Sequence, residues 1–254
     1  MGVELDVTQP LLLTAGEGEI IGDTADRRVE ILSDHEALNA TWSRFGPHRD
    51  GADPHIHRRH TDLFYVLEGE LTIGLGADRD ETVVAAGTLV LAPPFVVHAF
   101  RNGSAEDVRY LNFHAPGEGF ADYLRGRRDG REASFDQEEP PADGGRTVGD
   151  AVVSRGGPVL ADIDEIGVAE VRGEPGSSPA PPHLHRRHLQ YLYVLAGELT
   201  VLAGGRELGA SPGSWVQIPP GVPHSLAFRG SEGVRFLDIH APSFGLGETD
   251  QELV

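Results

Sequence analysis

The sequence contains no cysteine, and all 21 of its basic residues are arginine, so lysine is absent as well. Without cysteine the chain forms no disulfides, performs no thiolate catalysis and builds no zinc–thiolate site. Without lysine it cannot form a Schiff base between a side-chain amine and a carbonyl substrate. Several enzyme classes are therefore excluded by composition alone.

The chain also has little positive charge and no long apolar run. Forty acidic residues give a formal net charge of -19, which repels nucleic acid. The one basic cluster, Arg125-Gly-Arg-Arg128, lies beside an acidic stretch. No stretch reaches the roughly 18 apolar residues of a membrane span, and residues 1–10 lack the basic and apolar regions of a signal peptide. We expect a soluble, cytoplasmic protein that binds neither nucleic acid nor membranes.

Histidine, by contrast, follows a pattern that occurs twice. Ten of the twelve histidines belong to it. The first copy contains His55, His57, His60, His98 and His114, and the second contains His183, His185, His188, His224 and His240. Histidine is the commonest metal ligand in proteins, so the two matched clusters predict two metal sites or their remnants.

The spacing of the two copies indicates an ancestral duplication. His55 and His57 lie 128 positions before their counterparts, whereas His98 and His114 lie 126 positions before theirs. The two missing residues fall in a loop that is Gly-Leu-Gly-Ala-Asp-Arg-Asp in one copy and Leu-Ala-Gly-Gly-Arg in the other, as expected for a hairpin loop that changes length. We predict an N-terminal domain over residues 1–118, a linker over 119–147 and a C-terminal domain over 148–254.

Short apolar runs separated by Gly, Pro, Asn and Asp predict an all-β fold. The expected strands are 62–67, 70–73, 88–91 and 108–113 in the first copy, and 191–195, 198–202, 214–218 and 234–239 in the second. One short helix is expected at residues 120–125. The charged segment that follows, with Pro140-Pro141 and Gly144-Gly145, is predicted to be a linker that is disordered in part.

These motifs resemble those of a bicupin, a chain of two tandem cupin domains. The first cupin motif runs from Gly51 through His55-Ile-His57 and Asp62 to Gly69, and the second runs from Gly87 through Pro93 to His98 and Asn102. The second copy has matching blocks from Pro182 to Gly197 and from Gly213 to His224. The resemblance implies two jelly-roll-like β-barrels, with a metal bound inside each.

The candidate ligands follow from strand geometry as well as from the resemblance. Residues i and i+2 of a strand point to the same face, so His55 and His57 both face the interior, and a hairpin return brings Asp62 beside them. His98 completes the set from another strand. His183, His185, Gln190 and His224 are the equivalent set in the second copy. Imidazole and carboxylate ligands suit Fe, Mn, Ni, Co, Cu or Zn, and we expect one divalent ion per barrel.

The fourth ligand position departs from the family, in which a glutamate is usual. Asp62 keeps the charge on a shorter side chain, so it either binds the ion or orients a histidine. Gln190 removes the charge and leaves a site that retains its ion less strongly. The N-terminal site is therefore expected to be the main active site, with Asp62 as its catalytic residue.

The remaining repeated histidines, His60, His114, His188 and His240, have two interpretations. They are either structural or solvent-facing residues, or groups at the barrel mouth that support the ligands or carry protons. The Arg58-Arg59 and Arg186-Arg187 pairs are expected to be solvated, with steering of an anionic substrate as the alternative.

The predicted function is that of an enzyme acting on a small molecule. Three histidines and open coordination positions favour a dioxygenase whose substrate chelates the metal, as a flavonol, diketone or catechol does, with dioxygen as the second substrate. The sequences of residues 64–70 and 113–116 are similar to those of quercetin-dioxygenase-like bicupins. The expected pocket lining is Phe64, Val66, Val90, Phe100 and Phe113. The alternatives are a redox-neutral isomerase or decarboxylase and a metal-assisted binding protein without turnover. Oligomeric state stays open, with a homo-oligomer among the outcomes.

Overall fold

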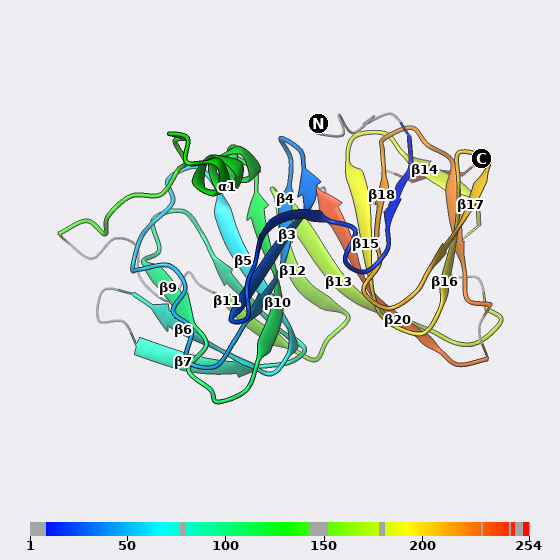
Figure 1. The fold of residues 1–254 in the computed structure, drawn as a ribbon. Coiled ribbons are helices and arrows are strands. Elements are labelled where there is room, and N and C mark those ends of the chain that lie inside the picture. Colours follow the sequence, from blue (N-terminus) through cyan, green and yellow to red (C-terminus); the bar gives the residue numbers. More distant parts are fainter. Residues whose placement is uncertain are drawn as a thin grey trace. The chain divides into compact units, whose positions relative to one another are not determined.

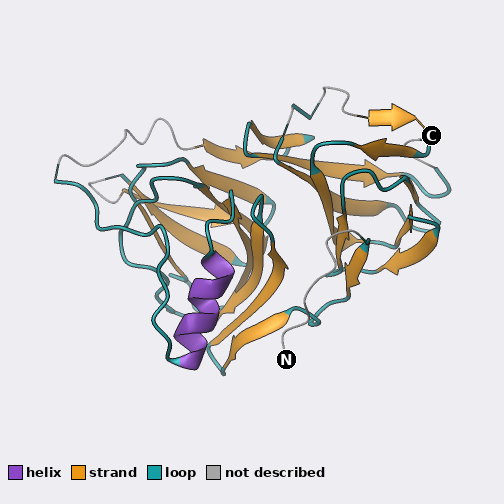
Figure 2. Cartoon of the chain, turned by 90° about the horizontal axis from the view of Figure 1, so that it is seen from above, coloured by secondary structure: helices purple, strands orange, loops and turns teal. Residues whose placement is uncertain are grey.

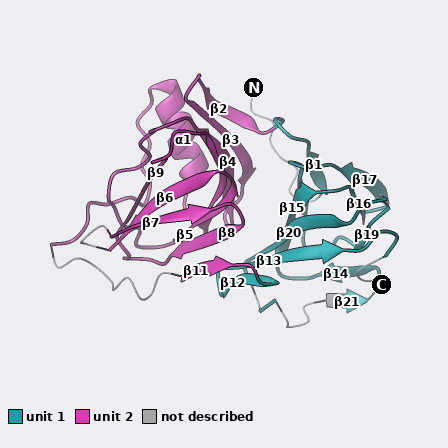
Figure 3. Cartoon of the chain, turned by 90° about the horizontal axis from the view of Figure 1, so that it is seen from below, with its two compact units in different colours: residues 1–17, 157–254 teal, residues 18–156 magenta. Residues whose placement is uncertain are grey.

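The computed structural model describes residues 9–76, 80–142, 152–177, 181–229, 231–243, 245–246 and 251–253. Within these ranges the chain forms strands and a single helix, α1 (Phe120–Asp129) (Figures 1 and 2). Two compact units are distinguished in Figure 3: unit 2 is Gly18–Gly156, and unit 1 combines Met1–Glu17 with Gly157–Val254. The predicted all-β fold is confirmed.

Unit 2 contains a larger and a smaller antiparallel sheet. The larger sheet has the strand order β11-β8-β5-β10-β4-β3-β2, and the smaller has the order β7-β6-β9. The bounds are β2 (Glu19–Asp23), β3 (Arg27–Asp34), β4 (Asn39–Phe45), β5 (Thr61–Glu68), β6 (Glu70–Leu75), β7 (Asp80–Ala85), β8 (Thr88–Ala92), β9 (His98–Arg101), β10 (Val108–Ala115) and β11 (Val152–Arg155). Phe64, Leu71 and Tyr110 are part of the core between the sheets, and α1 adds Ala121 and Leu124 to it.

Unit 1 repeats this arrangement with two further sheets. Their strand orders are β1-β18-β15-β20-β13-β12 and β17-β16-β19-β14-β21. The bounds are β1 (Leu11–Leu13), β12 (Val159–Ile163), β13 (Ile166–Gly173), β14 (His183–His185), β15 (Leu189–Ala196), β16 (Leu199–Ala203), β17 (Arg206–Ala210), β18 (Trp215–Ile218), β19 (His224–Ala227), β20 (Val234–Ala241) and β21 (Gln251–Leu253). Its core includes Leu192, Val201 and Phe236.

Two short strands belong to the unit of the other half of the sequence. β1, near the N-terminus, pairs with β18 of unit 1. β11, which follows the predicted linker, pairs with β8 of unit 2. Each strand extends the edge of a sheet and satisfies backbone groups that would otherwise be unpaired. The compact units therefore differ from the domain limits expected from sequence at both places, and the limits 1–118, 119–147 and 148–254 stay a prediction.

The strand predictions agree with the structure, and two details differ. Strand pairing forms each jelly-roll-like unit from two sheets that do not close into one continuous barrel. The helix predicted for residues 120–125 continues to Asp129, and Gly130 ends it in the left-handed conformation that glycine adopts readily. Residues 143–147 of the predicted linker lie outside the described residues. Among the described helices, none is long and apolar enough to cross a membrane.

A glycine in each unit explains one of the repeated motifs. Gly69 and Gly197 have φ angles of 75° and 74°. A Cβ atom would lie 2.5 Å from the carbonyl oxygen of Asp107 at the first position and 2.4 Å from that of Gly233 at the second. Only glycine fits such a turn, because it has no Cβ and pays little for a positive φ.

Candidate metal centres

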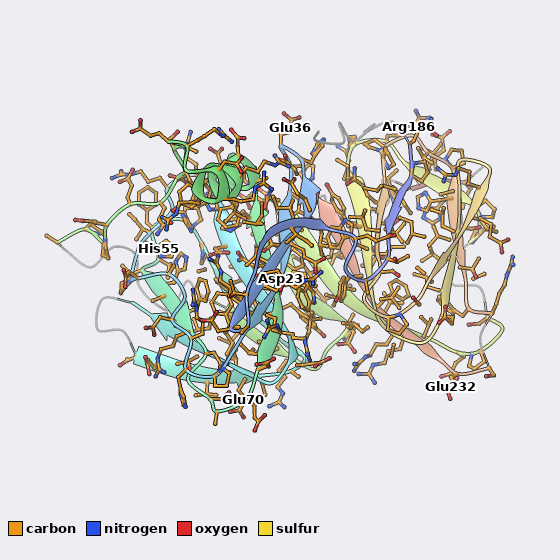
Figure 4. The ribbon with its side chains drawn as sticks, viewed as in Figure 1. Asp23, Glu36, His55, Glu70, Arg186 and Glu232 are labelled. Carbon is orange, nitrogen blue, oxygen red and sulfur yellow. The ribbon has the colours of Figure 1, made fainter. Side chains whose placement is uncertain are left out.

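The N-terminal centre brings together the four residues expected from sequence. His55 pairs with His98 across an isolated bridge, His98 begins β9, and Asp62 is the second residue of β5. One ligand atom from each of His55, His57, Asp62 and His98 lies within 4.8 Å of the others. All four side chains are buried, with exposed fractions of 5% or less. Figure 4 marks His55 in unit 2.

Backbone carbonyls fix how the three imidazoles are presented. Nδ1 of His55 lies 2.7 Å from the carbonyl oxygen of Asp53, and Nδ1 of His98 lies 2.9 Å from that of Val96. Nδ1 of His57 hydrogen-bonds the carbonyl oxygen of Asp136. A carbonyl only accepts, so each Nδ1 carries the proton and each Nε2 keeps a lone pair. This is the form in which histidine binds a metal.

The Nε2 atoms of the three histidines and the carboxylate of Asp62 face one another, and none of these atoms carries a proton. Nε2 of His98 lies 3.2 Å from Oδ2 of Asp62, and Nε2 of His57 lies 3.8 Å from the same oxygen. Nε2 of His57 is buried and has no hydrogen-bond partner among the described residues. Acceptors gathered in this way are stabilised by a cation between them, so the donor set fits a divalent metal.

Ionisation states agree with this geometry. Burial, together with nearby His98 and His57, lowers the pKa of His55 to about 3, so this imidazole is neutral at neutral pH. Burial acts to raise the pKa of Asp62, but the surrounding imidazoles, His114 first among them, outweigh it and hold this pKa well below its usual value. Neutral imidazoles and an ionised carboxylate are the ligand forms that metal binding requires.

Asn112 on β10 orients the carboxylate, and sequence reasoning missed it. Its Nδ2 donates to Oδ1 of Asp62 at 2.5 Å, which leaves Oδ2 directed at the histidines. In the β5–β10 ladder Asp62 pairs with His114, so Asn112 is the diagonal neighbour on the same face. Oδ1 of Asn112 lies 3.0 Å from Nε2 of His114.

His60 and His114 form a second buried layer behind the ligands. Nδ1 of His114 lies 3.0 Å from Nε2 of His60, whose Nδ1 lies 3.2 Å from Oδ2 of Asp136. With His57 they make a further cluster of ligand atoms within 4.8 Å. Their exposed fractions are 0% and 2%, so the solvent-facing interpretation is wrong for both.

Part of the predicted linker covers this centre. We call residues 135–138 the strap. Phe135 packs 5.4 Å from the ring of His57, centroid to centroid, and the carboxylate of Asp136 accepts the backbone N–H groups of Arg58 and Arg59 at 2.9 and 2.7 Å. Glu138 pairs with Ile56 through two backbone hydrogen bonds. The strap thus completes the N-terminal centre from a distant part of the sequence.

The C-terminal end supplies a matching strand to the other centre. In β21, Glu252 pairs with Leu184, the residue between His183 and His185. The ion pair of Arg58 with Glu138 recurs as that of Arg186 with Glu252, so these arginines are not merely solvated. The triplet Asp136-Gln137-Glu138 recurs in the sequence as Asp250-Gln251-Glu252, and Asp250 lies outside the described residues. This repeat was the signal that would have located the strap.

The C-terminal centre is built in the same way. Ligand atoms of His183, His185 and His224 lie within 4.8 Å of one another, and all three side chains are buried. Nδ1 of His183 and Nδ1 of His224 lie 3.0 and 2.9 Å from backbone carbonyls. Burial lowers the pKa of His185 to about 3 and that of His224 to about 4. His188 and His240 form the layer behind, at positions equivalent to His60 and His114.

The acid and amide positions are exchanged between the two centres. Nε2 of Gln190 donates to Oδ1 of Asp238 at 2.8 Å, and Oε1 of Gln190 is buried with no hydrogen-bond partner in the described part of the chain. Gln190 stands where Asp62 stands, and Asp238 stands where Asn112 stands. A carboxylate is therefore present in the C-terminal centre, but Asp238 lies one hydrogen bond behind the amide of Gln190 and not at the fourth ligand position.

A cavity of about 550 Å³ opens onto the N-terminal centre. Its walls include His55, His57 and Asp62 together with residues of α1 and of the strap. Of the five lining residues expected from sequence, Phe100 lines this cavity, whereas the other four are buried core residues. The cavity wall is instead aromatic through Phe45, Phe120, Tyr123 and Phe135.

Comparison with known proteins gives a family and a fold. The cupin domain family matches residues 41–114 and 169–240, which together make up more than half of the chain. Quercetin 2,3-dioxygenase of Bacillus subtilis is 32% identical over 98 residues, which cover 38% of this chain and 28% of that protein. The match thus spans less than a third of the length of that relative.

Solved structures extend the similarity in fold to nearly the whole chain. An S161A mutant of Bacillus subtilis oxalate decarboxylase has a TM-score of 0.62 at 14% identity, covering 92% of this chain and 78% of that one. Protein Ylba from E. coli has a TM-score of 0.67 at 12% identity, covering 98% and 95%. With two matched domains, each holding one copy of the repeated histidines, the chain belongs to the cupin family and is a bicupin.

Proposed function

We propose that the protein is a metal-dependent dioxygenase that acts on a small chelating substrate at the N-terminal centre. The observation that carries this proposal is the set of lone pairs on His55, His57, His98 and Asp62, which converge beside a cavity of substrate size. The similarity to a quercetin 2,3-dioxygenase supports the reaction class.

The residues of the N-terminal centre have different roles in this proposal. His55, His57 and His98 hold the metal through Nε2, and Oδ2 of Asp62 either completes the ligand set or accepts the substrate proton. When bound, a redox-capable ion supplies open positions for an enolate or catecholate-like oxygen next to dioxygen. Asn112 keeps Oδ1 of Asp62 occupied, so Oδ2 is the oxygen available to the reaction. Phe135 and Phe120 exclude water from the cavity side.

For the C-terminal centre we propose a ligand set of His183, His185, His224 and the amide oxygen of Gln190. A carboxylate only accepts hydrogen bonds, so the atom of Gln190 that faces Asp238 is the NH₂ group, and the oxygen points away from Asp238. Asp238 fixes the orientation of the Gln190 amide, and its negative charge acts on the metal through that hydrogen bond instead of by direct contact. This centre holds a metal and is not the main site of turnover.

The test combines elemental analysis of the purified protein with oxygen-consumption assays on flavonols, diketones and catechols. The proposal expects a redox-active metal and oxygen uptake with at least one of these classes. Zinc without oxygen uptake would overturn it in favour of a redox-neutral isomerase or decarboxylase, or of a binding protein without turnover.

A further inference from the structure

The wall of the cavity at the N-terminal centre carries four arginines in addition to its aromatic rings. Three of them have partners. Arg49 pairs with Asp26 at 2.5 Å, Arg128 pairs with Glu19 at 2.9 Å, and Arg127 donates to the hydroxyl of Tyr123 at 3.3 Å. The fourth is Arg27.

The side chain of Arg27 has no hydrogen bond or ion pair with any described residue. Its Nε atom is buried without an acceptor. Its nearest described interaction is with the ring of Phe45, whose centroid lies 5.8 Å from Cζ of Arg27. A buried N–H group without an acceptor is costly, and the other N–H donors of this half-buried guanidinium remain available for a ligand. The wall of the cavity therefore carries a positively charged hydrogen-bond donor that an anionic acceptor would satisfy.

The placement of Arg27 follows from strand alternation. It is the first residue of β3, and Val29 and Ile31, which share its face, are buried in the core of unit 2. The chain has 40 acidic residues for 21 arginines, so the missing partner does not reflect a shortage of carboxylates. An arginine held on the inner face without a counterion is suited to bind a planar carboxylate of a ligand by two parallel hydrogen bonds.

We propose that Arg27 binds the carboxylate of the substrate, whose chelating end lies at His55, His57 and Asp62. The substrate is then an aromatic acid, with a chelating pair of oxygens at one end and a carboxylate at the other. The aromatic walls of the cavity, such as Phe45 and Phe100, contact its apolar body. This inference rests on the proposed function only for the chelating end.

The strand register gives the separation of the two ends. Arg27 pairs with Phe45, and Phe45 pairs with Val108. Asn112, which holds Asp62, lies four residues further along β10, or about 13 Å along the strands at about 3.3 Å per residue, and β3 lies three strand spacings of about 4.8 Å from β5, which carries Asp62. Since the side chains of Arg27 and of the metal ligands span much of this separation, a ligand with a single ring and a short acid chain is the right scale.

The test uses 3-(3,4-dihydroxyphenyl)propionate and its uncharged primary amide as probes. Both are titrated calorimetrically into the zinc-loaded protein, in which no oxidation takes place. We expect the wild-type protein to bind the acid about 10-fold or more tightly than the amide, and Arg27→Gln to remove this preference while affinity for the amide changes less than about 2-fold. Arg27→Lys should restore part of the preference, because it keeps the charge without the paired donors.

Arg49→Gln is the matched control, because it removes the same charge from the same cavity wall at an arginine that already has a carboxylate partner. It should retain the preference for the acid. Zinc content and the circular dichroism spectrum establish that each variant is folded and loaded. Equal binding of acid and amide by the wild-type protein, or equal losses in Arg27→Gln and Arg49→Gln, would overturn the inference. A preserved preference in a protein that consumes no oxygen would overturn the proposed function and leave the Arg27 subsite standing.

Discussion

The two centres share their histidine geometry and differ in where the negative charge lies. In the N-terminal centre the carboxylate of Asp62 faces the histidines, and the amide of Asn112 is behind it. In the C-terminal centre the amide of Gln190 occupies the inner position, and the carboxylate of Asp238 is behind it. Both centres thus contain one carboxylate and one amide joined by a hydrogen bond, but the two groups have exchanged positions. A change that looks like the loss of a ligand in one strand is balanced by a gain in the neighbouring strand.

This reversal has a consequence for metal binding. A carboxylate in direct contact neutralises part of the charge of a divalent ion, whereas a neutral amide does so only weakly. A carboxylate one hydrogen bond away strengthens the amide as a ligand and holds its orientation. We therefore expect the N-terminal centre to hold its metal more tightly and the C-terminal centre to hold a more Lewis-acidic ion.

The largest expected difference comes from removing ligands in one centre at a time. His55→Ala with His57→Ala should abolish turnover, with a loss of more than about 100-fold, and reduce the metal content from two ions to one. His183→Ala with His185→Ala should also remove one ion but leave most of the turnover. Metal analysis and steady-state rates measure both effects. The reverse pattern of activity would show that the C-terminal centre is the main active site.

Exchanging the pair should convert one centre into the other. Asp62→Gln with Asn112→Asp gives the N-terminal centre the arrangement of Gln190 and Asp238, and we expect its metal affinity to fall by about 10- to 100-fold, towards that of the C-terminal centre. Competition with a chromophoric chelator measures the two affinities. Asp62→Gln alone is the comparison, and it should lose more affinity than the double variant, because no carboxylate remains. If the single and double variants are equal, the neighbouring position has no role.

A smaller effect is expected from Asp238→Asn. Loss of the charge behind Gln190 allows its amide to rotate, so the affinity of the C-terminal centre should fall by about 10-fold while that of the N-terminal centre is unchanged. Gln190→Glu is the matched variant, because it places two carboxylates side by side and tests whether Asp238 is there for its charge. Tighter metal binding by Asp238→Asn would contradict this account of the pair.

The smallest effects concern the strap and its ion pair. Asp136→Ala removes the acceptor of two partly buried backbone N–H groups and of the buried His60, and should lower the free energy of unfolding by about 1 to 3 kcal/mol. Glu138→Ala breaks an exposed ion pair with Arg58 and should cost less than about 1 kcal/mol. Urea denaturation of the metal-free protein compares the two. Equal effects would mean that the strap acts through its backbone alone.

The sequence by itself determined the features that depend on local periodicity. Short apolar runs bounded by turn residues predicted the strands, and the i, i+2 spacing put His55 and His57 on one face. The repeat offsets identified equivalent residues in both halves, and Gly69 and Gly197 marked turns that exclude a side chain. These features require only neighbouring residues and the comparison of one half with the other.

The tertiary structure decided which distant residues complete each centre. Asn112 is 50 residues from Asp62 in sequence, and Asp136 is 79 residues from His57. Such contacts depend on strand register and on the path of the chain after α1, and no local pattern encodes either of them. The same holds for the cavity wall, where Phe64 is a core residue and Arg27 faces the interior without a partner. Periodicity tells which face a side chain occupies, but only the folded chain decides what lies opposite that face.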